Sequence, residues 1–565
     1  DQLRAAGAAQ TLRMGVPDTL AVAAQPADAL VHSALARLTQ GVSPASIAGA
    51  YLDWAVHLAG SPAKWQELLV KAQRKSSRFA LYAAQPAGSW EPCIEPLPQD
   101  RRFAHPDWRA WPFNLMQQGF LLAQQWWWNA TTSVRGVQPH HEQLVEFMTR
   151  QWLDMFSPSN FPLTNPEVLR ETAHRAGANL VQGAMNWWDD ALRLAANRPH
   201  AGLERWRVGE NLAVTPGKVV YRNHLIELIQ YAPQTASVRP EPLLIVPSWI
   251  MKYYILDLQP HNSLVNFLVQ RGYSVFIISW KNPTAREREL GLEDYIRSGV
   301  LAALGAIAKI VPGTRAHALG YCLGGTILTM AAALLAREGD ERLATLSLLA
   351  AETDFEEPGE LSLFIDESQI SFLEDLMFTR GYLDGKEMGG AFALLNSKDL
   401  VWSRMVSEYL MGERAPMTDL MAWNADGTRM PYRMHTEYLY RLYLDNELSS
   451  GRFPVRGEPV RLSDLKMPMF VVGTETDHVA PWRSVYKINL FADTDVTFLL
   501  TSGGHNVGVV NPPGGFAGAS FQVATRGKED RYVDPETWHE ATPARKGSCG
   551  IGPAGRLLQP RIGGR

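Results

Sequence analysis

The chain has 565 residues, of which 46% are hydrophobic and 20% charged, a composition typical of folded proteins with room for two or three domains. Its 54 basic and 58 acidic residues leave a net charge of −4, which gives no electrostatic basis for binding nucleic acid. The three cysteines, Cys93, Cys322 and Cys549, are far apart, which argues against a disulfide framework or zinc site and suits a reducing cytoplasm. The longest weakly charged apolar run, 299–311, is too short to cross a bilayer, so we expect no membrane span. The start of the chain lacks the charged, apolar and small-residue pattern of a signal peptide, so we expect none there.

Residues 1–205 are predicted to form a mainly helical N-terminal domain. Residues 1 to about 60 are Ala-rich with scattered prolines, which indicates a weakly ordered tail leading into short helices. Apolar residues at helical spacing then predict an amphipathic helix over 62–82. Further helical patterns cover 117–128, 143–156 and 165–195.

Three consecutive tryptophans, Trp126, Trp127 and Trp128, end one of these predicted helices. Exposed, such a cluster would face a hydrophobic polymer or a membrane surface. Because aromatic side chains are usually buried, we favour packing in the core.

Residues 206–565 are predicted to form an α/β catalytic domain. Strand patterns alternate with helical ones, which predicts a parallel sheet covered on both faces. The alternation stops over about 355–453, a stretch rich in aromatic residues, and resumes after it. An insertion of this size is most simply a cap over the active site. The strands are expected at 219–231, 243–246, 274–280, 315–319, 344–350, 469–472 and 497–500, and the helices at 263–270, 292–311, 326–336 and 484–491.

The sequence Gly320-Tyr321-Cys322-Leu323-Gly324 has the pattern of a nucleophile elbow, with cysteine in the place of serine. Glycine is needed two positions either side of the nucleophile, because a side chain there would collide with the backbone of the sharp strand-to-helix turn. The thiol would stand at a helix N-terminus, where the helix dipole favours the thiolate. The alternative is a buried, inert cysteine in a tight turn.

A base and an acid should follow the nucleophile, each on a loop after a strand. Asp477 and His505 lie at such positions, and Asp477 would fix the tautomer of the histidine while His505 takes the thiol proton. The alternatives are His478, which more simply flanks the acid in its loop, and Asp495, which precedes its strand.

The oxyanion of an acyl-transfer reaction needs two backbone N–H donors. Leu323, the residue after the nucleophile, would supply one. The second is expected from the loop over 248–251, and Ile250 is our candidate.

A cysteine nucleophile favours a thioester substrate. Transfer of an acyl group from a thioester to a thiolate is nearly isoenergetic, so the acyl-enzyme stays activated for a second nucleophile. A hydrophobic cap that excludes water would protect this intermediate from hydrolysis. We expect no metal and no cofactor.

As an ordered set, these sequences resemble the polyhydroxyalkanoate synthases over roughly residues 60–515. The resemblance rests on Gly320-Tyr321-Cys322-Leu323-Gly324-Gly325 together with Asp100-Arg101-Arg102-Phe103, Asn165-Pro166-Glu167-Val168-Leu169, Tyr221-Arg222-Asn223, Lys252-Tyr253-Tyr254-Ile255-Leu256-Asp257-Leu258, Ser279-Trp280-Lys281-Asn282-Pro283, the run 396–402, Trp423-Asn424, Asp477-His478-Val479-Ala480-Pro481-Trp482 and Gly504-His505-Asn506-Val507-Gly508.

The resemblance implies an α/β-hydrolase fold with Cys322, Asp477 and His505 as the catalytic triad. It implies polymerisation of (R)-3-hydroxyacyl-CoA into a polyester with release of CoA, by a homodimer at the surface of cytoplasmic granules. The N-terminal domain would serve granule, partner or dimer contacts. The single-subunit type is implied, and the wording Tyr253-Tyr254-Ile255-Leu256 is closer to the short-chain class.

The family pattern is lost in the tail over about 540–565, where a Gly/Pro/Arg-rich stretch replaces a helix with two tryptophans. A diverged end or a shifted reading frame would explain this, and Cys549 there is expected to be a bystander. Two other functions fit the same residues: a cysteine thioesterase or depolymerase, and a catalytically silent granule-binding protein.

Overall fold

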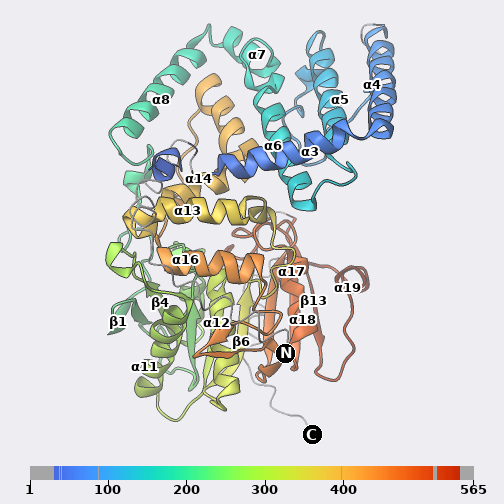
Figure 1. Ribbon diagram of the computed structural model, residues 1–565. Coiled ribbons are helices and arrows are strands. Elements are labelled where there is room, and N and C mark those ends of the chain that lie inside the picture. Colours follow the sequence, from blue (N-terminus) through green and yellow to red (C-terminus); the bar gives the residue numbers. More distant parts are fainter. Residues whose placement is uncertain are drawn as a thin grey trace, which may run out of the picture.

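The computed structural model describes residues 31–36, 39, 41–86, 88, 90–395, 397–512 and 518–547, without the side chains of 391–393 and 399. Figure 1 shows three layers: a twisted sheet with its flanking helices, a layer of cap helices above it, and a group of N-terminal helices on top. The chain therefore builds from the top layer down into the sheet, and residues after the sixth strand return to form the middle layer.

The sheet has ten strands in the order β1-β2-β4-β3-β5-β6-β11-β12-β13-β14. The central strands from β4 to β12 are parallel, whereas β1, β2, β13 and β14 pair antiparallel at the two edges. The strands are β1 Gly217–Arg222, β2 Ile226–Tyr231, β3 Pro242–Val246, β4 Ser274–Trp280, β5 Ala316–Tyr321, β6 Leu343–Leu349, β11 Met469–Thr474, β12 Val496–Thr501, β13 Ser520–Arg526 and β14 Arg545–Lys546.

The expected alternation of strands and helices is confirmed for the centre of the sheet and wrong at its edges. Residues 219–231 form a hairpin of two strands, and β13 and β14 were not predicted. The strand predictions agree best with the structure where a strand is buried on both faces. In β3, Leu244 and Val246 belong to the core on one face, and Leu243 and Ile245 to the core on the other, which is why the run reads as continuously apolar.

Helices cover both faces of the sheet. Helix α12 is buried along almost its whole length, and the predicted helix over 292–311 is one continuous run made of α10, a π-helical turn and α11. The predicted helix over 484–491 divides into α17 and α18. The bounds are α9 Leu264–Val269, α10 Leu292–Asp294, η6 Tyr295–Leu301, α11 Ala302–Ile310, α12 Leu323–Arg337, α17 Trp482–Tyr486, α18 Ile488–Phe491 and α19 Pro535–Ala541.

The insertion between β6 and β11 is helical and lies over the sheet, as Figure 1 shows for α13 and α16. Two short antiparallel pairs accompany its helices: β9–β10 is a hairpin, whereas β7 and β8 are joined across α14, η8, η9 and α15. The bounds are α13 Glu367–Arg380, α14 Gly385–Leu395, η8 Lys398–Ser403, η9 Val406–Leu410, α15 Asp419–Ala425, α16 Tyr432–Tyr438, η10 Leu439–Leu444, β7 Tyr382–Leu383, β8 Met430–Pro431, β9 Pro454–Val455 and β10 Glu458–Pro459.

The N-terminal helices pack on this insertion. Helix α8 lies so close to η9 that a Cβ at Gly183 would come within 1.9 Å of the Tyr409 carbonyl oxygen. The predicted run over 165–195 breaks into α7 and α8 because Ala176 and Gly177 adopt positive φ. The bounds are α3 Pro44–Ala59, α4 Pro62–Ala83, α5 Phe113–Thr131, α6 Pro139–Met155, α7 Pro166–His174 and α8 Ala178–Ala195.

The expectation that the tryptophan cluster is core is wrong. Trp126 is half-buried and donates its indole N–H to the Leu68 carbonyl, but Trp127 and Trp128 are 37% and 55% exposed. Helical spacing explains the difference, since three consecutive positions cannot all face one side of a helix.

The two ends of the chain are only partly described. In the predicted weak tail, residues 44–59 form the regular helix α3, and residues 1–30 lie outside the described residues. At the other end, β14 pairs with β13, while Cys549 and the rest of the tail from residue 548 lie outside them. Within the described part of the chain, no helix is long and apolar enough to span a membrane.

Candidate active site

Cys322 stands at the turn between β5 and α12. Its backbone is strained, with φ 53° and ψ −132°, a conformation seldom adopted by a residue with a side chain. A Cβ at Gly320 would lie 2.3 Å from the Gly325 Cα, and one at Gly324 would lie 2.2 Å from the Val246 carbonyl oxygen. The turn is therefore closed to any other residue at both positions, and it holds the thiol at the N-terminus of a 15-residue helix.

His505 and Asp477 reach the same place from loops after β12 and β11. The Nδ1 atom of His505 lies 2.7 Å from Oδ2 of Asp477. The Cys322 thiol lies close enough to the ring to contribute to the pKa of His505. The Asp477 carboxylate also accepts from the Thr474 hydroxyl at 2.6 Å and from the backbone N–H groups of Val479 and Ala480 at 2.9 Å. These four contacts fix the carboxylate, which in turn fixes the imidazole ring.

The electrostatics favour a charged histidine. Burial alone would lower the pKa of His505, but the charge of Cys322 and the hydrogen bonds to Asp477 and Cys322 outweigh it and raise the pKa well above its usual range. Burial raises the pKa of Asp477, yet the hydrogen bond and charge of His505 lower it overall. Both shifts stabilise a protonated His505 paired with the Asp477 carboxylate. An imidazolium beside a cysteine is the arrangement that activates a cysteine nucleophile.

The two residues expected to supply N–H donors line the same cavity as Cys322. Leu323 is the first residue of α12, so its N–H has no partner within the helix. Ile250 lies in the loop after β3, where its carbonyl oxygen accepts from Thr428 of the cap at 3.1 Å. The position fits the expected oxyanion site, and the direction of the two N–H groups toward a substrate stays a prediction.

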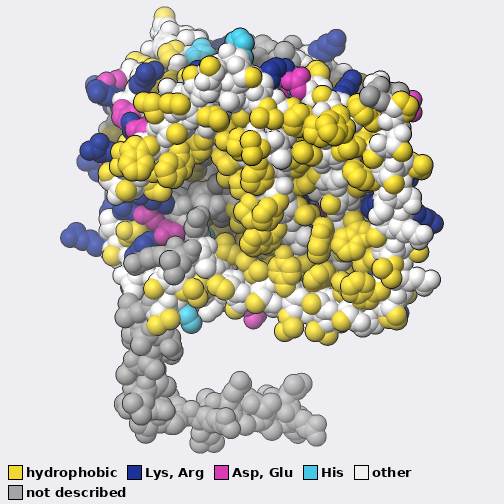
Figure 2. Space-filling view, turned by 90° about the horizontal axis from the view of Figure 1, so that it is seen from above, with side chains coloured by type: hydrophobic (Ala, Val, Ile, Leu, Met, Phe, Trp, Pro, Cys, Tyr) yellow, Lys and Arg dark blue, Asp and Glu magenta, His cyan; other side chains and the backbone are white. Residues whose placement is uncertain are grey.

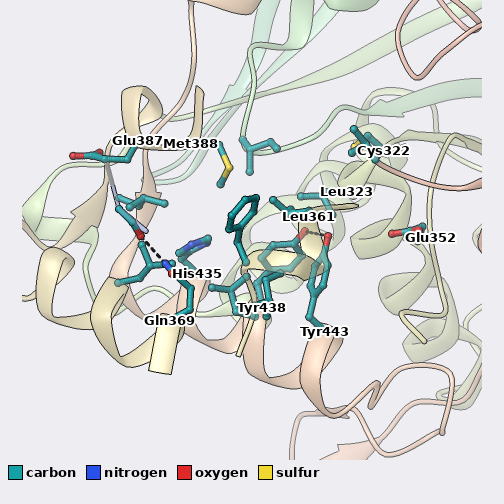
Figure 3. A pocket seen from close by; sticks show the side chains of 18 of the residues that line it. Cys322, Leu323, Glu352, Leu361, Gln369, Glu387, Met388, His435, Tyr438 and Tyr443 are labelled. Carbon is teal, nitrogen blue, oxygen red and sulfur yellow. Dashed lines mark hydrogen bonds between the residues drawn. The ribbon is translucent and has the colours of Figure 1, made fainter. Parts of the chain in front are cut away.

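The cavity above the thiol is small and apolar, with a volume of about 90 Å³ (Figure 3). This space is enough for a small group such as a short acyl chain. The cap supplies most of its walls, which include Leu361, Phe364, Ile365, Leu373, Met388 and Tyr438.

The N-terminal segment closes part of the same cavity. Gly41 and Val42 line it, and Gln369 of α13 holds them there: its carbonyl oxygen accepts from the Ser43 N–H at 2.7 Å and its amide donates to the Gly41 carbonyl at 2.6 Å. This part of the site could not be predicted from residues 1–60, because the contact joins residues more than 320 positions apart.

The alternative acid and base lie elsewhere. Asp495 is exposed just before β12, and its carboxylate accepts from the Lys528 N–H at 2.8 Å. His478 lines a different cavity, between the catalytic layer and α6. Cys93 donates its thiol hydrogen bond to Gln118 in the N-terminal helices.

One buried acid in the site was missed by the sequence reasoning. Glu352 follows β6, is 5% exposed, and lines the cavity with Cys322. A signal was available, since carboxyl ends of parallel strands gather site residues at one edge of the sheet. Among the residues that the structure describes, no group of three His, Cys, Asp or Glu side chains is placed to hold a metal ion.

Fold and site together define an enzyme of the α/β-hydrolase class whose nucleophile position is a cysteine. Three family models match: "Poly-beta-hydroxybutyrate polymerase (PhaC) N-terminus" over residues 99–268, "Poly-beta-hydroxybutyrate polymerase N terminal" over 22–64, and "alpha/beta hydrolase fold" over 241–512. Curated relatives match over most of the chain.

The chain is 41% identical to a poly(3-hydroxyalkanoate) polymerase of Methylorubrum extorquens, over 80% of this chain and 75% of that one. It is 39% identical to the PhaC subunit of the Rhizobium meliloti polymerase, over 78% and 72%, and 36% identical to that of Cupriavidus necator, over 77% and 74%. A solved alpha/beta fold family hydrolase of Bacillus anthracis is 14% identical, with a TM-score of 0.30 over 51% of this chain and 92% of that one. The chain belongs to the poly(3-hydroxyalkanoate) polymerase family, and it is an acyltransferase-type enzyme.

Proposed function

We propose that this enzyme polymerises (R)-3-hydroxyacyl-CoA into a polyester and releases CoA, through a thioester on Cys322. The observation that carries the proposal is the proximity of the Cys322 thiol to His505, whose ring is held by Asp477, beneath an apolar cap in a chain of this family. A thioester needs no activation beyond this, because a thiolate exchanges with it at little cost in free energy.

The reaction would proceed in two transfers. The Cys322 thiolate attacks the thioester carbonyl, the bond from that carbon to the CoA sulfur breaks, and CoA leaves with the proton held by His505. His505 then takes the proton from the hydroxyl of a second hydroxyacyl group, whose oxygen attacks the acyl-enzyme. The new ester forms as Cys322 leaves as thiolate. Leu323 and Ile250 are proposed to donate to the carbonyl oxygen in both steps.

Purified protein incubated with (R)-3-hydroxybutyryl-CoA tests this function. We expect free CoA and an insoluble polyester, and neither product from Cys322→Ala. CoA with only free hydroxy acid would instead identify a thioesterase. No CoA from a folded wild-type protein would contradict both, and would favour a silent granule-binding protein.

We also propose that the enzyme works at the surface of polyester granules in the cytoplasm, as a homodimer. An apolar face supports the first part: viewed from above, the N-terminal layer presents many hydrophobic side chains (Figure 2). Exposed large residues of α5 to α8 and their loops include Trp127, Trp128, Trp152, Phe156, Phe161, Trp187 and Trp188. Monomeric soluble proteins seldom expose a patch of this kind without a partner.

Sedimentation with poly(3-hydroxybutyrate) particles separates the two roles of this face. We expect the double variant Trp187→Ser/Trp188→Ser to bind the particles more weakly, whereas Leu490→Ser, an equally exposed change on the catalytic domain, should bind as the wild type does. A double variant that keeps particle binding but becomes monomeric in analytical ultracentrifugation would assign the face to the dimer.

A further inference from the structure

Glu352 occupies a fixed position beside the nucleophile. Its carbonyl oxygen accepts from the Thr326 hydroxyl at 2.7 Å, and Thr326 lies one turn along α12 from Cys322. The residue follows Leu349 at the end of β6, so the strand and the helix together determine where its side chain points. In Figure 3 the Glu352 carboxyl group projects into the cavity, toward the wall that carries Tyr443.

The surroundings leave one oxygen of the carboxyl group without a hydrogen-bond partner. Most of the cavity wall is apolar, and the Oε1 atom of Glu352 is fully buried with no hydrogen bond. Tyr438 and Tyr443 complete a polar corner, where the Tyr438 hydroxyl donates to that of Tyr443 at 3.2 Å (Figure 3). An unsatisfied polar atom in such a site costs free energy unless a ligand supplies the missing bond.

The protonation state decides what kind of ligand fits. Burial raises the pKa of Glu352 well above its usual range, and the negative charges of Asp477 and Cys322 raise it further. The neutral acid has one O–H donor and one free carbonyl acceptor. A hydroxyl group satisfies both, because it also donates once and accepts.

We propose that Glu352 is a specificity-determining residue that hydrogen-bonds the hydroxyl of the acyl group bound at Cys322. The inference rests on the proposed function, since it assumes that a hydroxyacyl thioester enters the cavity. An acyl group without the hydroxyl would leave the carboxyl group unpaired, and sites built to bond a hydroxyl reject such analogues strongly. Glu352 and Cys322 line the same small cavity, so an acyl group on the thiol would share it with the carboxyl group.

The test compares acylation by (R)-3-hydroxybutyryl-CoA with acylation by butyryl-CoA. Both can load Cys322 and release one equivalent of CoA, so single-turnover release and the mass of the acyl-enzyme measure loading alone. We expect the wild type to prefer the hydroxyacyl substrate by at least about tenfold. In Glu352→Met the preference should fall about tenfold through slower loading of the hydroxyacyl substrate, while Glu352→Gln, which keeps a donor and an acceptor, should stay within about threefold.

Two controls separate recognition from structure. Glu356→Gln changes an exposed acid of the same loop and should leave the preference unchanged. The rate of Cys322 alkylation by iodoacetamide and the unfolding temperature should be the same in Glu352→Gln as in the wild type. Equal losses with both substrates in Glu352→Met would indicate a general defect and overturn the inference.

The wild type alone also decides the matter if the methionine variant does not fold. Loading by both substrates at similar rates would overturn the role of Glu352 and leave the proposed function intact. Loading by neither would overturn both.

Discussion

Replacing Asp477 by asparagine tests whether its carboxylate sets the tautomer of His505. The Oδ1 atom of Asp477 accepts from the Val479 and Ala480 N–H groups, so the amide oxygen of asparagine must take that place. The NH₂ group then falls where Oδ2 meets His505 Nδ1 and the Thr474 hydroxyl. The hydroxyl can rotate to accept, but Nδ1 can accept only if the ring proton moves to Nε2, the nitrogen that must receive the thiol proton.

The variant should therefore fold and lose most of its activity. A wrong tautomer in a triad costs about 10³ to 10⁴ in kcat, or about 4 to 5.5 kcal/mol of transition-state free energy. CoA release from (R)-3-hydroxybutyryl-CoA measures the rate of the reaction. The rate at which iodoacetamide alkylates Cys322 reports how far His505 still activates the thiol. Asp495→Asn, the exposed acid before β12, is the matched control and should be unchanged. A kcat for Asp477→Asn within tenfold of the wild type would refute the role of Asp477 in setting the tautomer of His505.

Three further predictions concern stability, each read by chemical or thermal unfolding. Gly324→Ala puts a Cβ 2.2 Å from a backbone oxygen and should cost about 3 kcal/mol, whereas Gly305→Ala, in a helix with open space around it, should stabilise by about 0.5–1 kcal/mol; equal effects would contradict the elbow geometry. Burial lowers the pKa of His435 to about 4, so below pH 6.5 the unfolded chain binds a proton that the native one does not. Wild-type stability should thus fall about 3 kcal/mol more than that of His435→Met between pH 7 and pH 4, and parallel curves would exclude the effect. Arg102→Met removes the cation 2.8 Å from the fully buried Asp154, leaving Gln124 and the more distant Lys398, and should cost about 3–5 kcal/mol; a loss below 1 kcal/mol would show that the remaining partners suffice.

The central sheet and the elbow could be predicted because local pattern and tertiary role coincide there. Strands such as β3 are buried on both faces and read as unbroken apolar runs, and Gly320 and Gly324 are required by the turn itself. The order of Asp477 and His505 after their strands then follows from the fold.

The rest depends on contacts that sequence spacing does not encode. β13 has only one well-buried position, Gln522, so its edge pairing leaves no apolar run to read. The exposure of Trp128 depends on which face of α5 packs inward, and that is decided by other helices. Glu352 was not predicted as a site residue, because two of the residues that share its cavity, Tyr438 and Tyr443, lie roughly 90 positions further along the chain.

Gln369 pairs with the backbone at Gly41 and Ser43 much as one strand residue pairs with a neighbouring strand. This one side chain ties the segment around Gly41 to helix α13 beside the nucleophile. Any outward swing of α13 has to carry that segment along or break both bonds. A shortened protein that starts at Pro44 would keep every triad residue but would lack Gly41 and Val42, which line the cavity above the thiol. A difference in substrate preference between the full chain and this shortened protein would thus report the loss of part of the cavity wall.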